Sequence, residues 1–302
     1  MQFTTLEKLS YTNNKTEILA ITLLIIVFSL TGTALSFLYA YLNDISLTNI
    51  SEIFDGASTH DARQFFRVTA AIHQIFTFVL PCFFFWWIMK RKEAADFFRL
   101  SLFPLPKVLI FSFLFLVISL PLVGFSGWLN QLLPLPEWAT NVEADTAKMI
   151  SALLSVDSPL EWILNLLVIA AIPALGEELF FRGIVQTKLI NYFKSPHLAI
   201  WMGALFFSVF HFQFEGLFPR ILLGAVLGYL YYWSNNLWIP IILHFFNNAI
   251  LVSAPYFAIS DTVAVTDQQI GWEMIFAVLG AGFIGYFLIK NRNLFFDKKP
   301  IA

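Results

Sequence analysis

Long uninterrupted runs of apolar side chains constrain this chain more than any other feature of its sequence. Runs long enough, or nearly so, to cross roughly 30 Å of hydrocarbon lie at about residues 18–42, 68–89, 108–133, 159–180, 197–214, 219–233, 237–257 and 272–290. Backbone groups in lipid must be hydrogen-bonded within the protein, and these runs do not alternate as barrel strands would. The sequence therefore predicts an all-α polytopic membrane bundle of about eight transmembrane helices.

Composition agrees with this class and excludes others. The 302 residues are 58% hydrophobic and 13% charged, far from the values of soluble domains. A formal net charge of −2 provides no basic surface for nucleic acid, so we expect no nucleic-acid partner. Cys82 is the single cysteine, which excludes a disulfide within the chain, and its apolar surroundings predict a packing role.

No linker, composition shift or internal repeat divides the sequence, so we expect a single integral membrane domain over residues 1–302. The basic residues predict its orientation. With a cytoplasmic N-terminus, most cations fall on the cytoplasmic side, namely Lys8, Lys15, Lys90, Arg91, Lys92, Arg99, Lys107, Arg182, Lys188, Lys194, Lys290, Arg292, Lys298 and Lys299. Both termini are then cytoplasmic, and the lack of targeting features favours a bacterial plasma membrane.

Small residues in two of the apolar runs predict close contacts between helices. The stretch "GAVLG" covers Gly224 to Gly228, and Ala277, Ala281 and Gly285 recur in the last run. Such spacings allow helix backbones to approach in a membrane. We therefore interpret both groups as packing positions.

The stretch "GEELFFRG", residues 176–183, places charges within an apolar run. An ionisable residue there costs several kcal/mol unless it faces protein, water or a partner, which makes a functional role the first hypothesis. The structural alternative is a glutamate at the membrane interface, paired with arginine. Glu178 and Arg182 are spaced i,i+4 and can form such a pair. Glu177 points about 100° away, so the pair leaves it unexplained.

Two later runs also carry polar side chains. His211 follows "FFSVF", and "ILHFFNNAI" contains His244 and Asn248 on one helical face. Each has a structural alternative, either a packed interior histidine or a polar pair that joins helices. Glu177 lies about as far before the turn at "KSPH" as His211 lies after it, so antiparallel helices would bring them level. His244 follows its own turn too closely to match without a tilted or protruding helix.

Three motifs in order resemble one family. "EELFFR" matches EExxxR, "FSVFH" matches FxxxH, and "HFFNN" matches HxxxN. This pattern is similar to that of the CPBP intramembrane endopeptidases, which include type II CAAX prenyl proteases and bacteriocin-processing and immunity proteins. The resemblance covers about residues 159–257, which would be the catalytic core. The runs before residue 159 carry no such signature, and the core begins with the fourth run.

The resemblance implies that peptide bonds are hydrolysed inside the membrane. Glu177 and His211 would activate water, while His244 and Asn248 would donate hydrogen bonds to the developing oxyanion. Peptides or membrane proteins in the lipid bilayer would be the substrates, prenylated or not, and no cofactor would be needed.

The same resemblance implies supporting roles for other motif positions. Glu178 and Arg182 would support the site structurally, and Phe207 opens the second motif. Pro173 and Gly176, just before the glutamates, are places where the helix can bend.

A metal site is an alternative. Glu177, His211 and His244 could form a zinc site of the two-histidine, one-carboxylate type with an open position for water. No HExxH pair lies on one helix, which argues against it. Glu215, four residues after His211, could orient that imidazole or join the metal, although a place at the outer membrane surface is the favoured interpretation. For His60, His73 and His197 we expect structural roles.

Two other functional classes remain open. A transporter or channel would also need buried polar groups, but it should show broken helices in paired halves. A catalytically silent immunity or scaffold protein would keep the helices without needing Glu177, His211, His244 and Asn248. Loss of activity on Glu177→Ala separates an enzyme from a scaffold, and solute flux in vesicles would indicate transport.

Overall fold

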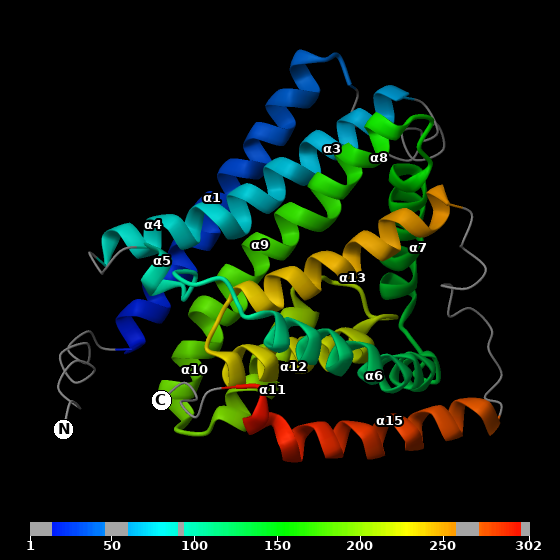
Figure 1. The fold of residues 1–302 in the computed structure, drawn as a ribbon. Helices are drawn as coiled ribbons and strands as arrows, with labels where there is room; N and C mark the ends of the chain where they lie inside the picture. The colour runs from blue at the N-terminus through cyan, green and yellow to red at the C-terminus, as the bar shows by residue number, and fades with distance from the viewer. Residues whose placement is uncertain (1–13, 46–59, 90–93, 258–271, 297–302) are drawn as a thin grey trace.

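The computed structural model describes residues 14–45, 60–89, 94–257 and 272–296 of the chain, and Figure 1 shows their arrangement. Every regular element in these ranges is helical, which confirms the all-α prediction. In chain order the elements are α1 (Asn14–Leu42), α3 (His60–Gln74), η3 (Ile75–Val79), α4 (Leu80–Ile88), α5 (Ala94–Phe97), α6 (Pro106–Gln131), α7 (Glu137–Leu154), α8 (Pro159–Asn165), η4 (Leu166–Ala171), α9 (Ile172–Glu178), η5 (Leu179–Gln186), α10 (Thr187–Phe193), α11 (Pro196–Val209), α12 (Leu217–Ser234), α13 (Trp238–Tyr256), α15 (Trp272–Asn291) and η6 (Arg292–Leu294). Three of them, η3, η4 and η5, are π-helical, and η6 is a 3-10 turn.

Six helical stretches among the described residues are long and apolar enough to cross a membrane. They are Thr16–Leu42, His60–Ile88, Pro106–Gln131, Pro159–Phe193, Trp238–Tyr256 and Ile275–Leu294. The predicted total of eight is not confirmed, because α11 has only 14 residues and α12 is not among the six. A helix of that length rises about 21 Å, which is short of the hydrocarbon thickness.

The predicted orientation stays a prediction. Several of the cations on which it rests lie outside the described residues, namely Lys8, Lys90, Arg91, Lys92, Lys298 and Lys299. The long apolar helices make the chain an integral membrane protein, but they do not determine on which side of the membrane each terminus lies.

The longest stretch, Pro159–Phe193, carries the glutamates and is bounded by local sequence signals. Ser158 caps its start, where the side chain accepts a hydrogen bond from the backbone N–H of Glu161. Its end is the left-handed residue Lys194, with φ of 54°. Ser195 then caps α11 in the same way. The chain therefore reverses within two residues, and α11 returns beside α10 (Figure 1).

Helix α3 is held against this stretch by a buried polar cluster. Arg63 and Arg67 both bind Glu161, with nitrogen to oxygen distances of 3.1 and 2.9 Å. Arg67 also donates to Asn165 at 2.7 Å. All four side chains are buried. Because 63 pairs with 161 and 67 with 165, the two helices run parallel, and the end of α3 reaches the level of α9. This cluster was not predicted from the sequence.

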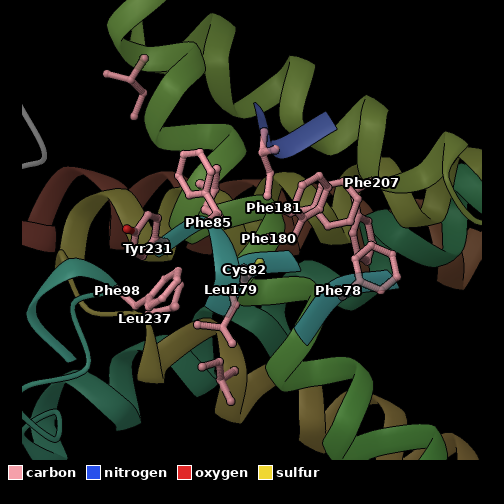
Figure 2. Packing of buried hydrophobic residues seen from close by; sticks show 14 of the residues in the cluster. Phe78, Cys82, Phe85, Phe98, Leu179, Phe180, Phe181, Phe207, Tyr231 and Leu237 are labelled. Carbon is pink, nitrogen blue, oxygen red and sulfur yellow. The ribbon is translucent and has the colours of Figure 1, made fainter. Parts of the chain in front are cut away.

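The main hydrophobic core lies where α4, η5, α11 and the start of α13 meet, and Figure 2 shows its packing. Phe181 packs edge-on against Phe207 at 5.2 Å between ring centroids and lies 5.9 Å from Phe78. Cys82 is fully buried in the same cluster, as its apolar surroundings predicted. Phe181 lies on the same helical stretch as the glutamates, so these aromatic side chains pack close to them.

The packing prediction for small residues is confirmed in α12 and partly wrong in α15. A Cβ on Gly224 would lie 3.2 Å from the Cβ of Ala204, and one on Gly228 would lie 2.8 Å from an oxygen of Gln186. Those glycines permit close helix contact. Ala281 is buried too, but Ala277 is exposed and a Cβ on Gly285 would meet no atom within 4 Å. Much of α15 stands away from its neighbours, so its small residues are not all contact points.

Candidate active site

Glu177 is buried deep between two helical stretches. Its side chain is 3% exposed, and its Oε1 accepts a hydrogen bond from Gln74 Nε2 at 3.2 Å. The preceding residue makes this approach possible, since a Cβ on Gly176 would lie 3.1 Å from the Cβ of Phe78. Among the described residues, Oε2 of Glu177 has no hydrogen-bond partner although it is fully buried. A buried carboxylate oxygen without a partner is costly. Oε2 of Glu178 is in the same state, and Oε2 of Glu177 differs from it by facing two histidines.

Two histidines face that oxygen. His211 Nε2 lies 3.8 Å from Oε2 of Glu177, and His244 Nε2 lies 3.9 Å from it. The other ring nitrogen of His211 is 2.8 Å from the carbonyl oxygen of Phe207, which can only accept, so Nδ1 carries the proton. In the neutral ring Nε2 is therefore an acceptor. The predicted meeting of Glu177 with His211 is found, although His211 lies just beyond the end of α11.

Glu178, next to Glu177 in the chain, binds Arg182 and His244. Its Oε1 accepts from Arg182 Nη1 at 2.7 Å, as the i,i+4 spacing predicted, and it also contacts His244 Nδ1 at 2.8 Å. Arg182 donates its other terminal nitrogen to the carbonyl oxygen of Gly224 at 2.9 Å. Because a carboxylate only accepts, Nδ1 of His244 donates to it and the imidazole is held in one orientation. The contact between Glu178 and His244 was not predicted.

Phe207 contacts three members of the cluster. Its ring lies edge-on to His211 at 4.8 Å and to His244 at 5.8 Å between centroids. The guanidinium of Arg182 lies 4.9 Å from the same ring. A buried aromatic ring next to a cation contributes on the order of 1 kcal/mol and limits water access. Phe207, 2% exposed, thus separates the two imidazoles from the core.

Asn248 lies one turn beyond His244 on α13 and reaches the interrupted helix. Its Nδ2 donates to the carbonyl oxygen of Ile169 at 3.5 Å. Pro173 is four residues after Ile169 and has no N–H to donate to that carbonyl. The proline thus leaves an acceptor that the amide of Asn248 meets. Around Pro173 and Gly176, where a bend was expected, the helix contains two π-helical segments, η4 and η5, which flank α9.

The turn that carries His211 is fixed by residues of three other helices, α6, α7 and α12. Asn130 donates to the carbonyl oxygen of Phe214 and accepts from the N–H of Phe218, both at 2.8 Å. Glu143 accepts from the N–H groups of Phe214 and Glu215. Arg220 binds Gln213 through both its carbonyl and its side chain. Asn130 and Glu143 were not predicted, because no spacing in the sequence links α6 and α7 to this turn. Arg220 on α12 was not predicted either.

Gln74 was missed for a different reason. It stands in the second apolar run, where a polar amide is as unusual as the two histidines that were selected. The signal for Gln74 is therefore its polar amide within an apolar run, the same kind of signal that marks His211 and His244.

The starting point of α13 explains how His244 reaches the depth of Glu177 although it lies close to its own turn. The backbone N–H of Leu237 donates to the carbonyl oxygen of Arg99, and Trp238 Nε1 donates to that of Leu100. Asn236 donates to the carbonyl of Leu102. Segment 99–102 therefore covers the turn, and Leu237 is fully buried. Since α13 starts inside the protein, a short distance along it suffices to bring His244 to the depth of Glu177.

The other polar candidates lie apart from this cluster. Glu215 is exposed, in agreement with the surface interpretation. His197 contacts the hydroxyl of Tyr229 at 2.9 Å, and His73 is exposed. His60 lies 3.5 Å from Glu161 at the edge of the buried cluster on α3. None of them is recorded in contact with Glu177 or Glu178 within the described part of the chain.

The zinc alternative concerns the geometry of Glu177, His211 and His244. Within the described ranges, no group of three His, Cys, Asp or Glu side chains is arranged to hold a metal ion. Zinc ligands lie about 2.0–2.2 Å from the metal, so their donor atoms approach one another more closely than the 3.8 and 3.9 Å found here. A metal would require the two imidazoles to move toward Glu177, and this alternative is left to experiment.

Comparison with known proteins identifies the region that contains this cluster. Residues 159–250 match a family model described as type II CAAX prenyl endopeptidase Rce1-like. The chain is also similar to the uncharacterized protein YpbD of Bacillus subtilis (strain 168), with 32% identity over 81 residues, which are 26% of this chain and 38% of that relative. The chain thus spans well under half of the length of this relative. No solved structure matches the chain. Residues 159–250 therefore carry an Rce1-like domain of the type II CAAX prenyl endopeptidase family.

Proposed function

We propose that this chain is an intramembrane endopeptidase that hydrolyses peptide bonds of membrane-associated or prenylated substrates. The observation that carries the proposal is the buried Oε2 of Glu177, which has no hydrogen-bond partner and faces Nε2 of both His211 and His244. The match to a family of endopeptidases supports the reaction class. The proposed catalytic core is residues 159–257, within a bacterial plasma membrane and with both termini in the cytoplasm.

In the proposed first step Glu177 and His211 activate water. The distance between Oε2 and Nε2 of His211 is longer than a direct hydrogen bond, and one water molecule bridges such a gap. Glu177 accepts a proton from this water while the water oxygen bonds to the scissile carbonyl carbon. The neutral His211 ring accepts a hydrogen bond at Nε2 and orients the nucleophile.

In the proposed second step the tetrahedral oxyanion is stabilised and collapses. Asn248 donates from its side-chain amide. His244, whose ring is held by the donation from Nδ1 to Glu178, presents Nε2 to the oxyanion as the second donor. Collapse breaks the bond between carbon and nitrogen, and Glu177 returns its proton to the leaving amine. Glu178, Arg182 and Phe207 hold these groups in place without touching the substrate.

The proposal is tested with the full chain in liposomes and the host membrane proteome as substrate. New peptide N-termini are counted for the wild type and Glu177→Gln, with and without a strong chelator. We expect cleavage that depends on Glu177 and survives chelation, and its sites reveal whether the substrates are prenylated. Loss on chelation would favour zinc at Glu177, His211 and His244. No Glu177-dependent cleavage by folded protein would overturn the proposal in favour of a transporter or a silent immunity or scaffold protein.

Asn248→Ala tests the oxyanion role separately. Removing one donor from a dry oxyanion site typically costs about 10²-fold or more in kcat. We expect a loss of that size with KM changed less than threefold, measured on a peptide found in the proteome experiment. Asn247→Ala is the matched control. Asn247 donates to Oδ1 of Asn248 at 3.2 Å, so its loss changes the surroundings of Asn248 but leaves both N–H donors of that amide in place, and the variant should keep more than a third of the activity. Equal losses in both variants would indicate a packing role instead.

A further inference from the structure

A cavity lies on the other side of the bundle from the glutamates. It has a volume of about 490 Å³ and is lined by residues of α6, α11, α12 and α15. On α12 the lining includes Val226, Tyr229 and Trp233, whereas Gly224 and Gly228 bind the side chains of Arg182 and Gln186 on the opposite face. No member of the candidate active site lines the cavity. It is therefore a separate compartment, and nothing in the proposed reaction uses it.

The basic side chains that line the cavity lie at one end. Arg292 follows α15, Trp233 lies in the last turn of α12, and His197 lies in the first turn of α11, so all three mark the same end of the bundle. The guanidinium of Arg292 lies 5.8 Å from the ring of Trp233, and His197 contacts the Tyr229 hydroxyl. No Asp or Glu is among the lining residues that the structure describes. This end therefore favours an anion flanked by aromatic rings.

The remainder of the cavity is mainly apolar, apart from the hydroxyls of Ser119 and Tyr286, and has the depth of one membrane leaflet. From Arg292 back to Ala281 the helix rises about 16 Å, and the apolar end is lined by Leu122, Leu222 and Ala281. Half of the hydrocarbon core of a bilayer is about 15 Å. An acyl chain of one leaflet fits this length, with its head group at the end marked by Arg292 and Trp233.

Two glycines leave the space open. A Cβ on Gly282 or on Gly285 would meet no atom within 4 Å, and both residues line the cavity. They differ in this respect from Gly176 and Gly224, where helices touch. The α15 glycines therefore make room for something other than a neighbouring helix of this chain.

We propose that this cavity binds an anionic phospholipid, with its phosphate at Arg292 and one acyl chain between α6, α12 and α15. The length of one leaflet selects a single acyl chain, and the positive end without acids in the described lining favours an anionic head group over a zwitterionic or uncharged one. The site is independent of the proposed endopeptidase reaction, since the two share no residue.

The test uses the full chain, stripped of lipid in detergent and mixed with phosphatidylglycerol or phosphatidylcholine of the same acyl chains. Native mass spectrometry measures the retained lipid. We expect the wild type to retain phosphatidylglycerol preferentially. Arg292→Gln should lower that preference about fivefold, the effect of one basic residue near an anionic head group. Equal retention of the two lipids by the wild type would overturn the proposal without any variant.

A second arm fills the cavity. Gly285→Leu places a side chain in open space, so we expect at least tenfold weaker retention of phosphatidylglycerol with unchanged helix content. Gly280→Leu is the matched control, because its Cβ also meets no atom within 4 Å and it does not line the cavity. Retention by Gly285→Leu that equals that of Gly280→Leu would place the lipid elsewhere. If Gly285→Leu does not fold, Gly282→Leu answers the same question.

Discussion

Replacing Glu177 with glutamine lowers kcat for peptide cleavage by about 10³-fold or more, while the fold stays intact. A positioned general base contributes about 10²–10⁴-fold, and the amide cannot take the proton from water. Glutamine keeps the size of the side chain and its contact with Gln74, so the 3.2 Å hydrogen bond at Oε1 has a counterpart in the variant. Initial rates on a peptide found in the proteome experiment, together with circular dichroism, measure both quantities.

Glu215→Gln is the matched control for this prediction. Glu215 lies four residues beyond His211 but is exposed and makes no recorded contact with the cluster. The same chemical change there should leave kcat within twofold of the wild type. If Glu177→Gln retained more than a tenth of the wild-type rate, Glu177 would not be the base, and the zinc and scaffold alternatives would have to be compared again.

The largest loss of stability is expected for Arg182→Met. Arg182 is 2% exposed and Glu178 is fully buried, and they are joined at 2.7 Å. Removing one partner of a buried ion pair leaves an uncompensated charge, which costs about 3–5 kcal/mol. The free energy of unfolding, measured by denaturant titration in mixed micelles, should fall by this amount. Lys290→Ala, which removes an exposed cation of α15, should change it by less than 0.5 kcal/mol.

The double variant Glu178→Gln with Arg182→Met separates the charge from the packing. With neither charge present, no ion is left unpaired, and replacement of a buried pair by uncharged groups is often close to neutral. We expect the double variant to recover more than half of the stability that Arg182→Met loses. Equal losses in the single and double variants would assign the effect to packing against Phe207 rather than to the ion pair.

Local periodicity explains which parts of the site could be predicted. Glu178 and Arg182 pair because one helical turn separates them, and this needs no information from elsewhere in the chain. The approach of His211 to Glu177 follows because the two residues lie at equal distances from a shared turn. At this turn Lys194 ends α10 and Ser195 caps the start of α11. The catalytic roles of Glu177, His211, His244 and Asn248 stay predictions until the variants are measured.

The number of membrane spans shows where hydropathy alone was insufficient. The run at 197–214 looked continuous, but its helix ends at Val209 and the chain turns through Phe212, which has φ of 50°. Asn130, Glu143 and Arg220 hold that turn from other elements. Aromatic residues keep the run apolar past the end of the helix, so composition could not mark the boundary.

The sequence by itself determined that this chain is an all-α membrane protein and which polar residues are candidates for its site, because continuous apolar runs and helical spacing are local properties. Only the tertiary structure decided how those residues meet. Segment 99–102 buries the start of α13 and thereby sets the depth of His244, and the Arg63, Arg67 and Glu161 cluster brings Gln74 to Glu177. These contacts join residues far apart in the chain, and no periodicity within one helix can encode the register between two.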